Sequence, residues 1–240
     1  MAYTRNEANL GLAGNWNRCL ALAETELVAL LHADDEVRPG YGRMMCEALM
    51  RYPDAAAFCC AADVIDANGR VTTSVPDAVK RVLSPRGKKP VTLSGEDAVA
   101  GLLKANFIVC PTLCYVVSKA RRPLFDTRWR HVMDLAMTTQ LLFDGKSIVW
   151  LPQREYRYRR HKENMSVVNT RTAVRFTEMA ELYGQVGKAA ADRGWNTAAR
   201  VARKMSIVKM NLTYCLFRDL VRSRGGAAWN KWRILRGLPC

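Results

Sequence analysis

The sequence predicts an α/β protein, a layered sheet with flanking helices, followed by a basic helical extension. Helical and strand-like segments alternate along roughly the first 170 residues, which is typical of layered α/β folds. The strand-like segments are short and continuously apolar, as buried strands are. Charge changes along the chain: residues 1–150 carry 18 Lys and Arg against 16 Asp and Glu, whereas residues 151–240 carry 19 against 6. We therefore expect a sheet domain over residues 1–169 and a basic α-helical extension over residues 170–240.

The composition excludes several classes of protein. With 49% hydrophobic and 25% charged residues, the 240-residue chain is neither disordered nor a membrane bundle. Its densest apolar stretch, 55–62, is too short to cross a bilayer, and no basic-then-apolar leader follows Met1. The 8 cysteines lie too sparsely for a disulfide scaffold and form no zinc knuckle, so we expect reduced, buried thiols and a cytoplasmic location.

The first half of the predicted domain alternates helix and strand. A helix is expected over 15–25, where apolar residues recur on one face, and a buried strand over the apolar run 26–32. A second helix is expected from Pro39 to about residue 52, because proline suits the first turn of a helix. The apolar run 55–65 is the next strand, and the turn signal at 66–69 predicts a hairpin.

The second half is less regular. Residues 76–93 are rich in Pro, Lys and Arg, and we expect a mobile surface loop there. The remaining expected elements are a helix over 94–105, strands over 107–109 and 113–118, a helix over 134–143, and strands over 148–151 and 155–158. From about residue 170 to 221 the chain favours helix.

An acidic motif, HADDE, follows the expected strand 26–32. Ligands of such sheets bind beyond the carboxyl ends of strands, so Asp34 and Asp35 are expected at the mouth of a cleft. Adjacent carboxylates repel each other unless a cation or hydrogen-bond donors lie between them. Mg²⁺ or Mn²⁺ is commonly held by one or two carboxylates together with phosphates, which makes a nucleotide diphosphate a natural co-ligand. The alternative is an exposed acidic turn that caps the helix at Pro39.

Four segments occur in a distinctive order. They are RNEANLGLAGNWNR (5–18), ELVALLHADDEVRPGY (26–41), FD (125–126) followed by DL (134–135) and Gly145, and RYRRHKENMS (157–166). In this order, and over about residues 3–166, the chain resembles a family 2 glycosyltransferase of the GT-A fold. The resemblance implies a mixed, mainly parallel GT-A-like sheet with flanking helices.

The sequence departs from that family at two points. His32 stands where the acidic motif usually begins with another Asp. The βαβ unit with which the family begins does not precede these segments, so we expect an N-terminally truncated domain with an exposed apolar sheet edge.

The resemblance also implies an activity. It is inverting, metal-dependent transfer of a sugar from a nucleotide-diphosphate donor to a hydroxyl acceptor, with a Mg or Mn divalent cation, in cell-envelope glycan or glycolipid synthesis. Asp134 would be the general base. The metal ligands would be Asp35, Asp34 and His161, and the donor contacts Asn9, Gly11, Asn17, Asp34, Arg157 and Arg160. The alternatives are a helix cap for Asp134 and a surface residue for His161.

The basic extension leaves several partners open. Basic helices with Trp and Leu can lie on an anionic membrane surface, which suits a lipid-linked acceptor and a peripheral position. Alternatively, these helices pack on the sheet domain and simply expose their charges. Two rival functions remain for the chain: a non-catalytic remnant of the same fold, and a nucleic-acid-binding module. The second is disfavoured, because the basic residues are not interleaved with stacking aromatics.

Overall fold

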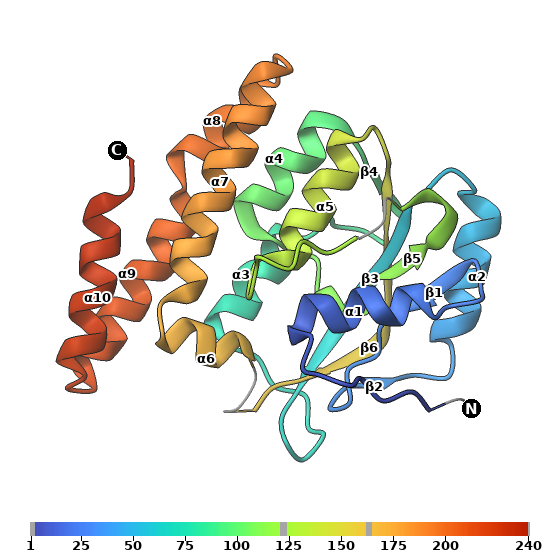
Figure 1. Cartoon of the computed structure of the whole chain (residues 1–240), viewed down its shortest axis with the longest axis horizontal. Helices are drawn as coiled ribbons and strands as arrows, with labels where there is room; N and C mark the ends of the chain where they lie inside the picture. Colours follow the sequence, from blue (N-terminus) through green and yellow to red (C-terminus); the bar gives the residue numbers. More distant parts are fainter. Residues whose placement is uncertain (1–2, 121–123, 162–164, 240) are drawn as a thin grey trace.

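The structure, a computed structural model, describes residues 3–120, 124–161 and 165–239 and has the expected mixed α/β architecture (Figure 1). The strands are β1 (Leu27–Ala29), β2 (Glu36–Val37), β3 (Ala57–Ile65), β4 (Val91–Leu93), β5 (Cys114–Val116) and β6 (Ile148–Arg159). The helices that accompany them are α1 (Gly11–Ala21), α2 (Tyr41–Arg51), α3 (Val75–Leu83), α4 (Gly95–Ala105) and α5 (Met133–Phe143), with 3-10 turns η1 (Cys110–Thr112) and η2 (Val117–Lys119). The C-terminal helices are α6 (Met165–Arg171), α7 (Val174–Asp192), α8 (Asn196–Lys204), α9 (Ser206–Val221) and α10 (Gly225–Gly237).

The sheet is mixed, with the strand order β1-β5-β3-β6-β2 and β4 also paired with β6. The expected parallel character is confined to β3 and β6, and the other pairings are antiparallel. β3 is apolar throughout its first half because both of its faces are covered: Cys59 belongs to the core cluster with α4 and α5, whereas Phe58 and Cys60 belong to the cluster with α2. β1 lies at one end of the strand order.

Most expected elements are present, but three expectations are wrong. Residues 76–93 are not a loop, since they contain most of α3 and all of β4. α3 begins with a capping box in which Ser74 and Asp77 satisfy each other's backbone N–H groups. Residues 107–109 form no strand, and the chain enters η1 instead. The two strands expected over 148–158 are one, β6, with Pro152 accommodated where the β3–β6 register shifts.

The C-terminal helices gather on the side of α4 and α5 that faces away from α1 and α2 (Figure 1). α7 and α8 contribute Leu182, Tyr183 and Ala198 to the same core cluster as α4 and α5. The Tyr183 hydroxyl donates a hydrogen bond to the Leu103 carbonyl at 2.5 Å. Within the described residues, none of the helices combines the length and the apolar character that crossing a bilayer requires. The boundary at residue 170 stays a prediction.

Candidate active site

Asp35 is fixed between β1 and β2 by contacts from β6. Its side chain is only 1% exposed. One carboxylate oxygen accepts a hydrogen bond from the backbone N–H of Arg159 at 2.7 Å, and the other accepts one from the Tyr156 hydroxyl at 3.0 Å. Burial raises the pKa of Asp35, although these two donors and nearby His32 oppose the rise. A buried carboxylate of this kind is stabilised by a cation at its side.

Asp34 is more exposed than Asp35 and meets the end of β6. Its Oδ2 lies 2.9 Å from Nε2 of His161, and its backbone carbonyl accepts a hydrogen bond from Nε of Arg159 at 2.7 Å. The structure therefore brings the expected metal ligands Asp34 and His161 together, with Asp35 adjacent.

His32 completes a group of ligands that suits a divalent cation. One ligand atom from each of His32, Asp34 and Asp35 lies within 4.8 Å of the others. Nε2 of His32 is buried and finds no hydrogen-bond partner among the described residues, while the ring stacks on Trp16 at 5.5 Å. The two carboxylates suit Mg²⁺ or Mn²⁺, and the imidazole nitrogen favours the softer Mn²⁺ over Mg²⁺. Sequence reasoning missed His32, which it regarded only as a replacement for a usual aspartate.

Asp134 lies in the first turn of α5, partly buried. Burial raises its pKa, while the ammonium of Lys80 on α3 and a hydrogen bond from the Asn106 side chain oppose the rise. Lys80 in turn has its pKa lowered by burial. Lys80 was missed because its segment was expected to be a loop, although the Ser74 to Asp77 spacing was a signal for the helix that carries it.

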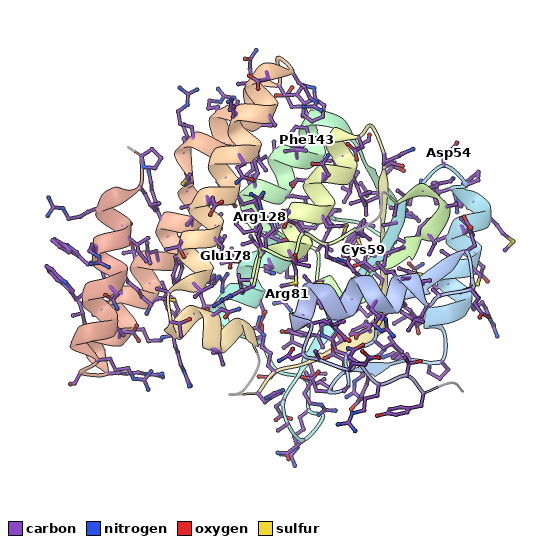
Figure 2. The ribbon with its side chains drawn as sticks, viewed as in Figure 1. Asp54, Cys59, Arg81, Arg128, Phe143 and Glu178 are labelled. Carbon is purple, nitrogen blue, oxygen red and sulfur yellow. The ribbon has the colours of Figure 1, made fainter. Side chains whose placement is uncertain are left out.

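Glu178 of α7 caps the start of α5. Its carboxylate accepts backbone N–H hydrogen bonds from Arg130, His131 and Val132, at 2.8 to 3.3 Å. Figure 2 labels Glu178 on α7 and Arg128 in the segment that precedes α5, and Arg128 donates a hydrogen bond to Gln185 of α7 at 2.9 Å. The N-cap residue Val132 makes no side-chain cap, whereas the Asp134 carboxyl interacts with the backbone of Leu135 in the first turn. The alternative interpretation of Asp134 as a helix cap therefore stays open beside its proposed role as the base.

Cys110, in η1, is half-buried and interacts electrostatically with both acidic regions. Burial raises the pKa of Cys110, and the negative charges of Asp134 and Asp35 raise it further, whereas Lys80 opposes them. A single thiol that interacts with both carboxylates indicates that the acidic motif and Asp134 approach one region of the protein. The site is therefore assembled from the β1–β2 connection, η1, α3 and the first turn of α5.

The expected donor contacts near α1 have local partners. Asn9 accepts a hydrogen bond from the backbone N–H of Gly11 at 2.9 Å, where Gly11 has a φ of 68° that favours glycine. Both residues line an open surface depression at the start of α1. The Asn17 amide makes two hydrogen bonds with the backbone of Phe125, at 2.7 and 2.9 Å. Asn17 therefore ties α1 to the segment that precedes α5.

The expected arginine contacts of β6 are paired with acids. Arg157 and Arg159 both form ion pairs with Glu36 of β2, and Arg160 pairs with Asp77 of α3 at 2.6 Å. These pairs join β6 to β2 and α3. Within the closing RYRRHKENMS segment, residues 162–164, and with them Asn164, lie outside the described residues.

Comparisons with known proteins agree with this architecture. Residues 1–97 match the family model described as glycosyl transferase family 2. No curated relative matches the sequence. The structure of S. aureus TarS residues 1–349 in complex with UDP-GlcNAc is similar at a TM-score of 0.52 and 16% identity, over 73% of this chain and 47% of that chain. A longer structure of S. aureus TarS is similar at a TM-score of 0.50 and 15% identity, over 75% of this chain and 28% of that chain.

The chain thus spans about half, or less, of the length of these two structures. At such identities the likeness concerns the fold alone, and it agrees with a GT-A-like sheet with flanking helices. Residues 1–97 thus resemble glycosyl transferase family 2, and the chain has the mixed α/β fold of its GT-A-like structural neighbours.

Proposed function

We propose that this protein is a metal-dependent, inverting glycosyltransferase that moves a sugar from a nucleotide-diphosphate donor to a hydroxyl acceptor. The observation that carries the proposal is the group of His32, Asp34 and Asp35, whose ligand atoms lie within 4.8 Å of one another. The electrostatic interaction of Cys110 with both Asp35 and Asp134 supports placing the proposed base in the same site. A donor diphosphate beside the motif and an acceptor hydroxyl beside Asp134 would then be neighbours, as direct transfer with inversion requires. The TarS structure solved with UDP-GlcNAc supports a UDP-sugar as the first donor to test.

In this proposal His32, Asp34 and Asp35 hold the divalent cation. A bound Mg²⁺ or Mn²⁺ supplies charge that offsets the negative charge of the departing diphosphate. Tyr156 and the backbone of Arg159 orient Asp35 through the two hydrogen bonds that it accepts. His161, which the resemblance implies as a further metal ligand, lies 2.9 Å from Asp34 and would hold that carboxylate in place.

Asp134 takes the proton from the acceptor hydroxyl. A general base must be ionised, and burial opposes ionisation because it raises the pKa of this carboxyl. The Lys80 ammonium favours the ionised form, so we assign Lys80 the role of a positioning residue for the base. Asn106 adds a hydrogen bond to the same carboxylate.

The acceptor is proposed from the family resemblance and the charge of the extension. A cell-envelope glycan or a glycolipid, reached from the cytoplasmic face of a membrane, would suit the basic C-terminal helices. Nucleic acid remains the less favoured partner.

The test is binding of UDP to the protein with and without Mn²⁺, measured by calorimetry and by thermal unfolding. We expect Mn²⁺-dependent binding that Asp35→Asn abolishes, while Asp134→Asn retains binding and loses turnover of UDP-GlcNAc. The matched control is Asp54→Asn, because Asp54 is exposed in the turn between α2 and β3, which carries none of the candidate site residues (Figure 2). Absence of metal-dependent binding in the unmodified protein would leave the non-catalytic remnant as the function, and full activity in Asp35→Asn would contradict the metal assignment.

A further inference from the structure

α9 presents apolar side chains to the solvent along one side. These residues recur every three or four positions and are between 44% and 70% exposed: Met210, Tyr214, Phe217, Leu220 and Val221. We call them the α9 stripe. The opposite side of the helix, with Val208 and Leu212, is fully buried. A helix that is apolar on both sides is normally covered on both sides, so the α9 stripe indicates a partner surface.

The charge around the α9 stripe has one sign. Residues 206–240 contain a single acid, Asp219, which is buried and lies 2.8 Å from the buried Nζ of Lys231. The other basic residues of this segment are Lys209, Arg218, Arg222, Arg224, Arg233 and Arg236. Two of them, Arg222 and Arg224, are exposed and directly follow Leu220 and Val221 at the end of α9. The surface is therefore apolar in its centre and cationic at its end.

We propose that the α9 stripe, together with Arg222 and Arg224, docks on the surface of an anionic lipid bilayer. Aliphatic and aromatic side chains enter the boundary between headgroups and acyl chains, while arginines contact the lipid phosphates. A nucleic acid would satisfy the arginines but would leave Leu220, Val221 and Met210 without an apolar partner. A second copy of this chain would cover the stripe but would bring further uncompensated arginines to the same surface.

The biological role of membrane docking rests on the proposed function. Docking would hold the transferase at the surface from which a lipid-linked acceptor extends. The docking itself requires neither donor nor turnover. A failure of membrane binding and a failure of the transferase assay are therefore separate results.

The experiment is flotation of the whole protein with two kinds of vesicle, pure phosphatidylcholine and phosphatidylcholine that contains about one third phosphatidylglycerol. We expect binding to the anionic vesicles that weakens as salt is added. Phe217→Ser combined with Val221→Ser should lower the partition coefficient about tenfold or more, because both apolar groups are lost. Arg222→Gln combined with Arg224→Gln should lower it on the order of tenfold, and most strongly at low salt.

Two control pairs match these changes elsewhere on the surface. Met50→Ser combined with Val71→Ser removes apolar side chains of similar exposure, and Arg43→Gln combined with Arg51→Gln makes the same change in net charge from exposed positions of α2. The proposal is overturned if anionic vesicles bind no protein at low salt, or if the controls lose as much binding as the stripe variants. It is also overturned if the stripe variants abolish self-association and leave vesicle binding intact.

Discussion

Glu178 is predicted to stabilise the helix that carries the proposed base, although it lies on α7. Its carboxylate accepts three backbone N–H groups from residues 130–132 at the start of α5. A hydrogen bond to a charged group contributes about 1.5 to 3 kcal/mol, and a negative charge at a helix N-terminus adds about 0.3 to 1 kcal/mol. Glu178 is only partly buried, and water can replace some of the lost bonds. We therefore expect Glu178→Ala to lower the free energy of unfolding by about 2 to 4 kcal/mol.

The assay is urea unfolding of the Ala variant and of Glu178→Gln, which keeps an acceptor but loses the charge and should cost about 1 kcal/mol. The matched control is Glu181→Ala on the same helix, since Glu181 is exposed. Among the described contacts, its carboxylate accepts one hydrogen bond, from the side chain of neighbouring Gln185 at 3.1 Å. We expect that control to change stability by less than about 0.5 kcal/mol. Equal losses in Glu178→Ala and Glu181→Ala would refute the capping role.

Two further predictions concern buried charges. Lys80 lowers the pKa of Asp134, so Lys80→Met should raise that pKa and move the acidic limb of the kcat/KM profile to higher pH; an unmoved limb would contradict the contact. Folding raises the pKa of Asp134, so the contribution of this carboxyl to the free energy of unfolding is present below its ordinary pKa and is lost as pH rises through the raised pKa. Urea unfolding across that pH range should show a larger loss of stability in Lys80→Met than in the unmodified protein. Lys231→Met should lower the free energy of unfolding by about 3 to 5 kcal/mol, because buried Asp219 loses its partner, and adding Asp219→Leu should restore most of it. A double variant as unstable as the single one, in the same urea assay, would show that the loss comes from packing rather than charge.

The sequence predicted those parts of the fold that depend on local pattern. The apolar runs around β3 and β5 identified buried strands because both faces of the sheet are covered there. The run around β1 identified a strand, but β1 lies at one end of the strand order and is only half-buried. The acidic motif was predicted to follow a strand because it comes directly after the apolar run 26–32. In contrast, the composition of residues 76–93 suggested a loop, because Pro, Lys and Arg dominate it, whereas the capping box at Ser74 and the burial of Lys80 make it a helix. Burial of a lysine against a distant carboxylate is a tertiary effect that no local pattern contains.

The ion pairs between charged residues could not be predicted from the sequence either. Arg157 and Arg160 were candidates for phosphate contacts because their type suits phosphate. In the fold, Glu36 and Asp77 lie close enough to form ion pairs with both. These acids come from segments more than 80 residues away in the chain, so only the register of β6 with β2 and the position of α3 bring them together. A donor phosphate that contacts these arginines must therefore compete with a carboxylate already in place.

The change in charge after residue 150 does not coincide with the end of the hydrophobic core. Leu182, Tyr183 and Ala198 share a core cluster with α4 and α5, and Glu178 caps α5 from the C-terminal side of that change. α7 thus supports the candidate site, because its Glu178 caps α5, which carries Asp134. The helices of the extension have two different roles. α7 and α8 use their apolar faces to complete the core, whereas α9 keeps an apolar face outside it. Packing on the sheet domain and binding an external surface, which the sequence left as alternatives, are therefore compatible in different helices of one extension.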